Sequence, residues 1–329
     1  MKKAAVGIDI GGTNSAFGIV DLEGKVLVKG SISTPDHGDA SIFIRSLSEA
    51  IRVSVQSAKT LYPDLQILGV GVGAPNANYY QGTIEHAPNL SFKGIVPLKA
   101  LLAQNLPEYG PVIVTKDANA AALGEMMYGG AKGMKHFAMY TLGTGVGSGL
   151  VVRGRLVYGQ DGFAGECGHS MLFPGGRECG CGIKGHLEAY CSASGMKRTA
   201  FELLARDNNS KSVLANYSYN ELESKTIFAA AKNGDKLAME VFELTGKWLG
   251  MAFADTVNHL SPEAIFLFGG PTAAGEFLFE PARKSMEAHL LPFYKGKVKI
   301  LPSQLSPGDA AIVGASALVY QTMETSTDE

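Results

Sequence analysis

A dense group of potential metal ligands lies in the middle of the chain. Four side chains of the types that bind zinc fall within 18 positions: His169, Cys179, Cys181 and His186. Thiolates and imidazoles at such short spacings suit one tetrahedral zinc ion. The rival interpretations are buried apolar cysteines and a redox pair, but a thioredoxin-type pair has two residues between its thiols and this chain has one. No fifth strong ligand is evident, so we expect a closed, structural zinc site.

A glutamate stands just outside each end of this cluster. Glu166 precedes it and Glu188 follows it. A metal that fixes the loop between them would hold both carboxylates in place, available for a task other than metal binding. The segment 165–188 is therefore expected to position two carboxylates.

Two glycine-rich turns have the composition of phosphate-binding loops. Glycine lets backbone N–H groups approach phosphate oxygens, threonine adds a hydroxyl donor, and an aspartate can hold Mg²⁺ through water. Glycine hairpins are common, but two similar turns that face each other across a cleft favour a phosphate role. Neither turn is a P-loop, because a strand follows and no Gly-Lys-Ser/Thr is present. The first turn contains Asp9, Gly11, Gly12 and Thr13, and the second contains Thr141, Gly143, Thr144 and Gly145.

Asp117 stands where an expected strand ends and an expected helix begins. An aspartate at such a place is usually an N-cap. A carboxylate at a cleft-lining helix start can also be a general base, accepting the proton of a sugar hydroxyl that attacks a phosphoryl group. Position alone leaves both interpretations open. In the same way, Gly269-Gly270 and Gly308-Asp309 could frame a nucleotide base or only permit close helix packing.

The composition bounds the class of protein. With 329 residues the chain is long for one core, so two lobes are expected. The formal net charge is −2 and the basic residues are scattered, which argues against a nucleic-acid or membrane-surface partner. No uncharged apolar run is long enough for a membrane span. Four cysteines in so long a chain do not form a disulfide scaffold and fit a reducing, cytoplasmic setting.

The hydrophobic pattern predicts two copies of one arrangement, in which a strand, a glycine turn, a strand, a turn and a strand follow each other. We therefore expect a duplicated α/β protein with a smaller N-terminal lobe (1–117), a larger C-terminal lobe (118–308), and a C-terminal helix near the lobe junction followed by a disordered tail (309–329). The two copies cover strands at 4–10, 15–20 and 25–33, and at 137–142, 147–153 and 155–158. Further strands are expected at 66–73, 111–115, 263–268 and 297–301, and helices at 39–60, 97–105, 117–127, 195–206, 220–232, 235–259, 276–290 and 309–320.

Taken together, these segments resemble the ROK family of sugar kinases, in the actin/hexokinase/Hsp70-like superfamily. GIDIGGTN looks like its first phosphate loop, TLGTGVGSG like its second, and KDANAAALGE like its catalytic-aspartate segment. GECGHSM followed by CGCGIKGHLE looks like its zinc and sugar-binding signature. The resemblance runs from about residue 4 to residue 320. It implies a two-lobed, ribonuclease H-like duplicated fold with an inserted structural zinc site.

The resemblance also implies residue roles. Asp117 becomes the expected catalytic base. Glu166, His169 and Glu188 would contact sugar hydroxyls, and His169 would bind zinc through its other ring nitrogen. The family's other sugar-facing positions correspond to Gly73, Asn76, Asn89 and Lys116. ATP and Mg²⁺ would be bound at Asp9, Gly11, Gly12, Thr13, Thr141, Gly143, Thr144, Gly145, Gly269 and Gly270.

The chain departs from the family pattern at three positions. His186 replaces the usual third zinc cysteine, and imidazole is an acceptable ligand. Asn76 replaces the last glycine of a Gly-Ala-Pro-Gly motif. Lys116 replaces an asparagine that contacts the sugar, and its ammonium group can donate a hydrogen bond but cannot accept one. The identity of the sugar therefore depends most on Lys116.

The implied activity is that of an ATP- and Mg²⁺-dependent hexose kinase acting on the sugar 6-hydroxyl. Glucose is the first choice, which would make the protein a glucokinase, and fructose, mannose or an N-acetylhexosamine is the alternative. The family also includes sugar-responsive repressors, but the first strand begins at residue 4 and leaves no room for their helix-turn-helix domain. A silent sugar-binding or scaffolding protein would be expected to lose Asp117 or a phosphate loop. A homodimer or higher homo-oligomer is implied by the resemblance alone.

Overall fold

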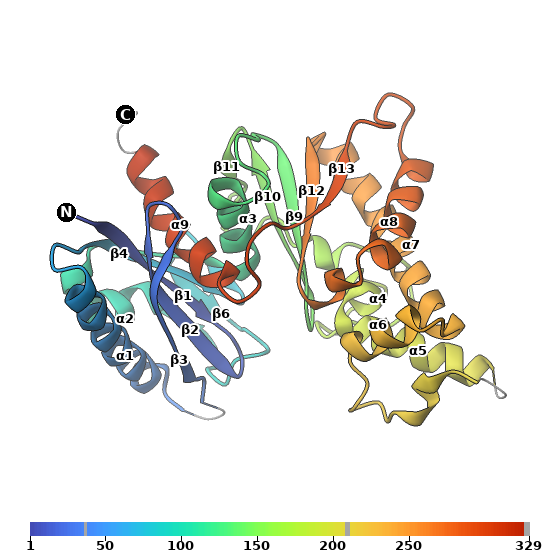
Figure 1. Ribbon diagram of the computed structural model, residues 1–329, viewed down its shortest axis with the longest axis horizontal. Helices are drawn as coiled ribbons and strands as arrows, with labels where there is room; N and C mark the ends of the chain where they lie inside the picture. The colour runs from blue at the N-terminus through green and yellow to red at the C-terminus, as the bar shows by residue number, and fades with distance from the viewer. Residues whose placement is uncertain (36–37, 208–210, 326–329) are drawn as a thin grey trace. The chain divides into compact units, whose positions relative to one another are not determined.

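The computed structural model describes residues 1–35, 38–207 and 211–325, and the chain divides into two compact units (Figure 1). The first unit is assembled from three stretches of chain, 1–134, 155–165 and 304–329, and the second from two, 135–154 and 166–303. Each unit is described by itself below. The predicted tail begins at the end of the last helix, and its residues 326–329 lie outside the described part of the chain.

The first unit contains a five-stranded mixed sheet in the order β3-β2-β1-β4-β8. β1 pairs antiparallel with β2 and parallel with β4, and β4 pairs parallel with β8. Because these three parallel strands run in the same direction, their carboxyl ends meet at one edge of the sheet. The strands are β1 (Lys3–Ile10), β2 (Asn14–Asp21), β3 (Val26–Ser33), β4 (Gln66–Ala74) and β8 (Val112–Lys116).

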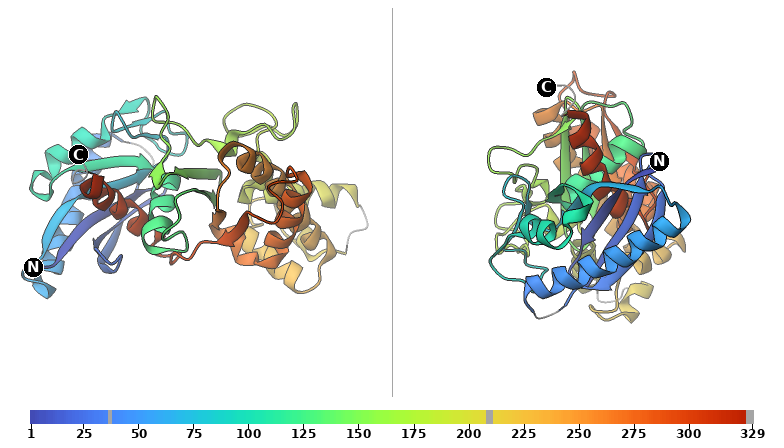
Figure 2. Two further views of the ribbon diagram at one scale, coloured as in Figure 1. Left: turned by 90° about the horizontal axis from the view of Figure 1, so that it is seen from above. Right: turned by 90° about the vertical axis from the view of Figure 1, so that its left-hand side faces the viewer.

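Helices cover both faces of this sheet (Figures 1 and 2). The alternation of β1 sends Val6 and Ile8 into a core shared with α1 (Ala40–Leu61), whose buried side chains recur at helical spacing. The opposite face of the sheet carries glycines, and α9 (Ala310–Thr325) packs directly against them. A Cβ on Gly71 would lie only 1.9 Å from the Ala315 carbonyl oxygen of this helix. The unit is completed by α2 (Leu98–Asn105), the 3-10 turn η1 (Pro107–Tyr109), α3 (Asp117–Tyr128) and a small sheet of β5 (Ala77–Asn78), β6 (Thr83–Glu85) and β7 (Ile95–Val96).

The second sheet repeats this plan with the order β11-β10-β9-β12-β13. β9 pairs antiparallel with β10 and parallel with β12, as β1 does with β2 and β4. The predicted duplicated α/β fold is thereby confirmed. The strands are β9 (Phe137–Leu142), β10 (Val146–Val152), β11 (Arg155–Leu156), β12 (Ala264–Phe268) and β13 (Lys299–Pro302).

A layer of helices packs with the second sheet around one large apolar core. Two of them, α7 (Lys236–Leu260) and α8 (Glu276–His289), contact each other closely at glycines: a Cβ on Gly250 of α7 would lie 2.4 Å from the Ala282 carbonyl oxygen of α8. Within the described residues, no helix has both the length and the apolar character that crossing a membrane requires. The elements are η2 (Cys167–His169), α4 (Glu188–Cys191), α5 (Ala193–Arg206), η3 (Val213–Asn216), α6 (Ser224–Lys232), α7 (Lys236–Leu260), η4 (Gly270–Ala274) and α8 (Glu276–His289).

The limits of the compact units, after residues 134 and 303, do not coincide with the lobe limits proposed after 117 and 308. The difference arises because α3 and α9 pack against each other and against the first sheet. At their crossing, a Cβ on Gly124 would lie 2.9 Å from the Cα of Gly314. The stretch 155–165 also packs with the first unit, although the chain on either side of it belongs to the second.

Candidate active site

Three of the predicted site residues meet at the carboxyl edge of the first sheet. Asp9 of β1 is level with Gly73 of β4, and a Cβ on Gly73 would lie 3.4 Å from the Cα of Asp117. Asp117 is the first residue of α3 and is exposed, and its carboxylate accepts a hydrogen bond from the Ala118 N–H at 2.7 Å. The N-cap position itself is occupied by Lys116, without a side-chain capping bond. Asp117 therefore presents its carboxylate at the sheet edge beside Asp9.

Asp9 has an unusual protonation equilibrium. Burial raises the pKa of its carboxyl group from 3.8 to about 7, and the negative charge of Asp117 adds to the effect. A bound cation would oppose this rise, since it stabilises the ionised form. Asp9 and Asp117 thus form an acidic pair that is suited to a divalent cation.

The first glycine turn approaches another predicted sugar-facing residue. Gly11 donates its N–H to the Asn14 carbonyl at 3.1 Å and closes the turn between β1 and β2. A Cβ on Gly12 would lie 2.5 Å from the Asn89 carbonyl oxygen, so only glycine fits there. Thr13 and Asn89 are both exposed. The first unit therefore brings a phosphate-type turn and the Asn89 loop into contact.

Asn76, the departure from the Gly-Ala-Pro-Gly motif, adopts a left-handed backbone conformation with φ 49°. Its amide donates to the carbonyl oxygens of Glu85 and His86, at 3.1 and 3.4 Å. Asparagine tolerates this conformation better than most residues. The side chain of Asn76 thus holds the loop after β4.

Lys116 is almost completely buried, with 5% of its surface exposed. Its ammonium group donates to the Ala164 carbonyl at 2.9 Å. Two further bonds reach the same stretch, from Asn78 to the Asp161 carbonyl at 3.0 Å and from the Tyr80 hydroxyl to the Gly159 carbonyl at 2.8 Å. Tyr79 stacks on Tyr158 with ring centroids 3.8 Å apart. We call residues 155–165 the strap, and Lys116 is one of its fastenings to the first unit.

In the second unit, Glu188 joins the second glycine turn to the cysteine-histidine cluster. One carboxylate oxygen accepts from the Val146 N–H at 3.0 Å, and the other accepts from the Cys179 thiol at 3.3 Å. A Cβ on Gly145 would lie 2.4 Å from the same Glu188 oxygen that binds Val146. The turn is closed by a bond from the Gly143 N–H to the Gly145 carbonyl at 3.0 Å.

The predicted nucleotide positions at 269–270 lie beside this second turn. Phe268 of β12 is level with Thr141 of β9. Gly269 has φ 113° and packs against the Leu142 backbone, where a Cβ would lie 2.1 Å from the carbonyl oxygen. Gly270 then begins η4. The structure therefore gathers Thr141, Gly143, Gly145 and Gly269 at the ends of neighbouring strands.

The four predicted metal ligands converge. One ligand atom from each of His169, Cys179, Cys181 and His186 lies within 4.8 Å of the others. Cys179 Sγ is 3.7 Å from His169 Nδ1, and Cys181 Sγ is 3.2 Å from His186 Nδ1. Two thiols and two imidazoles at these separations fit one tetrahedral zinc ion. The zinc-type cluster predicted from the sequence is confirmed.

Burial shifts the pKa values of two residues of this cluster, Cys179 and His186. It raises the pKa of the Cys179 thiol to about 12, and it lowers the pKa of His186, which His169 lowers further. A neutral imidazole is ready to bind a metal, whereas a buried thiol needs a cation before it ionises. The donor set is therefore one that a soft divalent cation would complete.

Glu166 and His169 stand at the two ends of the one-turn helix η2, Glu166 just before it and His169 as its last residue. The exposed Glu166 stands at its N-cap, and its carbonyl accepts from the His169 N–H at 3.0 Å. Between them, the Cys167 N–H donates to the Ser148 hydroxyl of β10 at 3.0 Å. The predicted sugar-binding pair is thus held to the second sheet by a buried hydroxyl.

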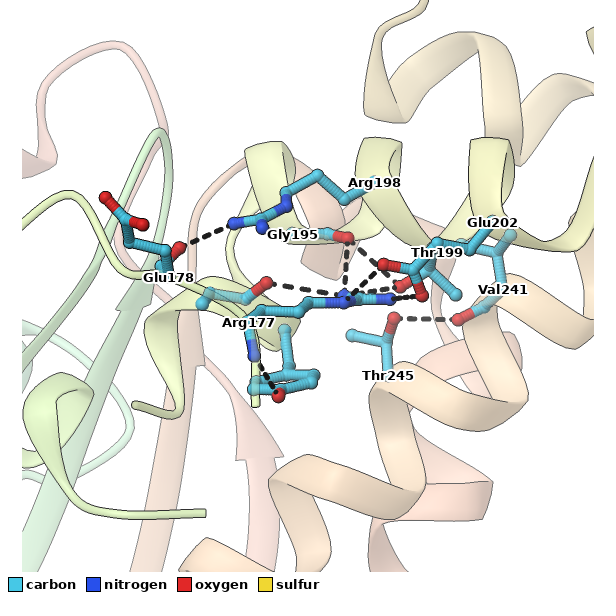
Figure 3. Close-up of polar contacts among 10 residues, drawn as sticks. Arg177, Glu178, Gly195, Arg198, Thr199, Glu202, Val241 and Thr245 are labelled. Atoms are coloured by element: carbon cyan, nitrogen blue, oxygen red, sulfur yellow. Dashed lines mark hydrogen bonds and ion pairs between the residues drawn. The ribbon is translucent and has the colours of Figure 1, made fainter. Parts of the chain in front are cut away.

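Sequence reasoning did not single out Arg177 or the tyrosines that hold the strap. Arg177 lies in the metal-binding segment, and its guanidinium group is surrounded by acceptors from helices further along the chain (Figure 3). Tyr79 and Tyr158 are far apart in the sequence and look like ordinary apolar residues. The one sequence feature that could have pointed to Arg177 is the single tryptophan, Trp248, because the guanidinium group of Arg177 lies over its ring.

Comparisons with known proteins agree with this arrangement. The model of the ROK family matches residues 5–322. A glucokinase of Halalkalibacterium halodurans is 35% identical over 318 residues, which cover 96% of this chain and 94% of that protein. The crystal structure of a ROK family glucokinase from Streptomyces griseus, in complex with glucose and AMPPNP, is 33% identical with a TM-score of 0.79, covering 97% of this chain and 99% of that one. A xylose repressor of Caldicellulosiruptor bescii is more distant, at 28% identity over 97% of this chain and 78% of that protein.

Proposed function

Because the chain belongs to the ROK family, as its motifs indicated, we propose that it is an ATP- and Mg²⁺-dependent hexose kinase with glucose as its substrate. The observation that carries the proposal is the meeting of Asp9, Gly73 and Asp117 at one sheet edge. The similarity to glucokinases, one of them bound to glucose and an ATP analogue, favours glucose over fructose, mannose or an N-acetylhexosamine.

We propose that Asp117 is the general base. The sugar 6-hydroxyl attacks the γ-phosphorus of ATP, a new O–P bond forms, and the bond between that phosphorus and the β,γ-bridging oxygen breaks. The hydroxyl proton passes to the Asp117 carboxylate, and the bond electrons leave with ADP. The exposed carboxylate of Asp117 suits this task, because a hydroxyl can approach it.

Mg²⁺ would neutralise the phosphate charge that develops in the transfer. Asp9 would hold the ion, since it lies at the same sheet edge as Asp117, whose negative charge adds to the pKa rise that burial causes in Asp9. Backbone N–H groups of the two glycine turns would bind the phosphates, and Gly269 and Gly270 would lie against the rest of the nucleotide.

We propose that Glu166, His169 and Glu188 bind the sugar hydroxyls, with Gly73, Asn76 and Asn89 as further contacts. Zinc at the four converging ligands would hold the segment 165–188 in shape and fix the tautomer of His169. Lys116 differs from the other members of the predicted sugar set, since its ammonium group binds the strap. Its contribution to sugar choice would then act through the strap.

The activity is tested by coupled ADP release with MgATP against glucose, mannose, fructose and N-acetylhexosamines. We expect the highest kcat/KM with glucose, and turnover of none of these sugars would refute the kinase proposal. Replacing Asp117 by Asn should lower kcat by about 10²- to 10⁴-fold while glucose binding, measured by calorimetry, is retained. A variant with near-normal kcat would exclude Asp117 as the base.

The metal is tested separately from the reaction. Elemental analysis of the purified protein should find about one zinc ion per chain. The Cys179→Ser variant should lose most of it, because a hydroxyl is a poor zinc ligand. Full zinc occupancy in that variant would exclude Cys179 from the ligand set.

A further inference from the structure

The metal-binding segment has a second attachment to the protein, at Arg177. The side chain of Arg177 is 9% exposed and lies among α4, α5 and α7 (Figure 3). Its Nε and one terminal nitrogen form a two-point ion pair with Glu202 of α5, at 2.9 and 2.6 Å. A planar guanidinium group fits a carboxylate in this way, whereas an ammonium group does not.

The other terminal nitrogen of Arg177 is shared among three acceptors on α4 and α5. It donates to the Ala189 carbonyl at 3.3 Å, to the Gly195 carbonyl at 3.2 Å and to the Thr199 hydroxyl at 3.0 Å. The carbonyl of Ala189 belongs to α4, which begins with Glu188. A hydrogen bond from a charged donor is stronger than one between neutral groups.

Two aromatic rings enclose the guanidinium group. Its central carbon lies 4.7 Å from the ring centre of Tyr190 and 5.3 Å from that of Trp248. The rings themselves meet edge to face, with centroids 5.2 Å apart. The Tyr190 hydroxyl accepts a bond from the Arg177 backbone N–H at 2.7 Å, so this ring holds both the side chain and the main chain of Arg177.

The main chain of Arg177 also joins the two arms of the metal-binding hairpin. Its carbonyl accepts from the Gly185 N–H at 2.8 Å, and the next rung runs from the Cys179 N–H to the Ile183 carbonyl at 3.0 Å. Cys179 and Cys181 follow Arg177 closely on one arm, and His186 follows Gly185 on the other. One anchored residue thus fixes the base of the hairpin that supplies three of the four ligands.

We propose that Arg177 is a positioning residue that docks this hairpin on α4, α5 and α7 and forms the ligand set before metal binds. The proposal rests on the zinc site of the proposed function, but it does not depend on the sugar or on phosphoryl transfer. Its physical basis is preorganisation: a hairpin that is already in place loses little conformational freedom when the metal arrives. Metal removal then leaves the base of the hairpin docked.

The single tryptophan makes the docking measurable. Trp248 is the only tryptophan of the chain, so its fluorescence reports on the ring stack around Arg177. In the metal-free wild type, prepared with a chelator, the emission spectrum should stay close to that of the zinc-loaded protein. A spectrum that shifts on metal removal toward that of the denatured chain would overturn the proposal.

The variant Arg177→Met keeps an unbranched apolar stem and removes every guanidinium bond. Zinc affinity, measured by competition with a chromophoric chelator, should fall about 10- to 100-fold, as for other residues that support metal ligands. The matched control is Arg198→Met, because Arg198 also donates to a carbonyl of the same segment, that of Glu178, but is only half-buried. The zinc affinity of Arg198→Met should differ from that of the wild type by less than about 3-fold, compared with the 10- to 100-fold loss expected for Arg177→Met.

Glu202→Gln covers the case in which Arg177→Met does not fold. It leaves Arg177 in place between its rings but removes the charge of the ion pair, and we expect an intermediate loss of zinc affinity. Wild-type zinc affinity in a folded Arg177→Met protein, or in Glu202→Gln if the former is unfolded, would refute the positioning role. Since zinc binding is measured without sugar or ATP, failure here is distinct from failure of the kinase proposal.

Discussion

Replacing Gly145 by alanine should separate sugar binding from phosphate binding. The new methyl carbon would lie 2.4 Å from an oxygen of Glu188 and 3.2 Å from its carboxyl carbon. An ordinary contact begins at 3.4 Å, so the oxygen has to retreat by about 1 Å. The same oxygen accepts the Val146 N–H bond at 3.0 Å, and a retreat of that size breaks it.

The magnitude follows from the hydrogen bond to a glucose hydroxyl that the displaced Glu188 carboxylate would lose. A hydrogen bond to a charged group contributes about 1.5–3 kcal/mol, and about 1.4 kcal/mol corresponds to a factor of ten in binding. If Glu188 binds glucose, as we propose, the KM for glucose should rise about 10- to 100-fold. A displacement of about 1 Å in a binding group is sufficient for such a loss.

The comparison variant is Gly143→Ala in the same turn. No atom lies within 4 Å of a Cβ at Gly143, so its methyl group meets only the space in which we place the ATP phosphates. Initial rates over a grid of glucose and MgATP concentrations give both KM values for each variant. We expect Gly145→Ala to raise chiefly the KM for glucose, and Gly143→Ala chiefly the KM for ATP.

Two results would refute this reasoning. An unchanged KM for glucose in Gly145→Ala, with normal thermal stability, would exclude Glu188 from the sugar site. A rise in the KM for ATP alone would instead assign the Glu188 carboxylate to the phosphate-binding turn. Zinc content should be measured in parallel, since Glu188 also contacts the Cys179 thiol.

Three further predictions concern the first unit. In metal-free buffer the free energy of unfolding should fall by at most about 4 kcal/mol as pH rises from about 4 to 7, because Asp9 has a pKa of about 7 in the folded protein and 3.8 in the unfolded chain, which ionises first. Urea titrations of the wild type and Asp9→Asn over this pH range check this. An equal dependence of the unfolding free energy on pH in both proteins would contradict it. Lys116→Met should remove the hydrogen bond to the Ala164 carbonyl, lower the free energy of unfolding by about 1–3 kcal/mol, and speed amide hydrogen exchange in the strap. Unchanged exchange would show that this bond does not hold the strap to the first unit. Gly71→Ala should destabilise the protein by about 1–3 kcal/mol or more, since its Cβ would lie 1.9 Å from the Ala315 carbonyl oxygen. The control Gly308→Ala should not, because no atom lies within 4 Å of its Cβ, and equal melting temperatures of the two variants would contradict the close packing of α9.

Much of the fold was predictable because its signals are local. Helical spacing of apolar residues predicted a helix over 39–60, and α1 spans Ala40–Leu61. The repeated strand and glycine-turn pattern predicted the duplication that the two strand orders confirm. The ligand types and spacing of the metal cluster were likewise sufficient, because all four ligands lie on one short segment.

Contacts between distant segments were not predictable. Residues 155–158 were expected to form one strand, but β11 ends at Leu156, because Tyr158 leaves the sheet to stack on Tyr79. Lys116 was expected to donate a hydrogen bond to the sugar, yet its ammonium group donates to a carbonyl 48 positions away in the sequence. Both outcomes depend on which segments the folded chain brings together, and no local pattern carries that information. The predicted roles of the site residues in binding and catalysis stay predictions.

The last helix of the described chain has consequences for how the protein is synthesised. α9 covers one face of β1 and β4, yet the ribosome makes every element of the second unit before it. Until α9 emerges, the glycine-lined face around Gly7 and Gly71 lacks the helix that covers it. The first unit therefore cannot be completed during translation in N-to-C order. A chain truncated before residue 310 would keep an open apolar face that chaperones recognise, whereas a circular permutant that places α9 ahead of β1 should fold its first unit earlier.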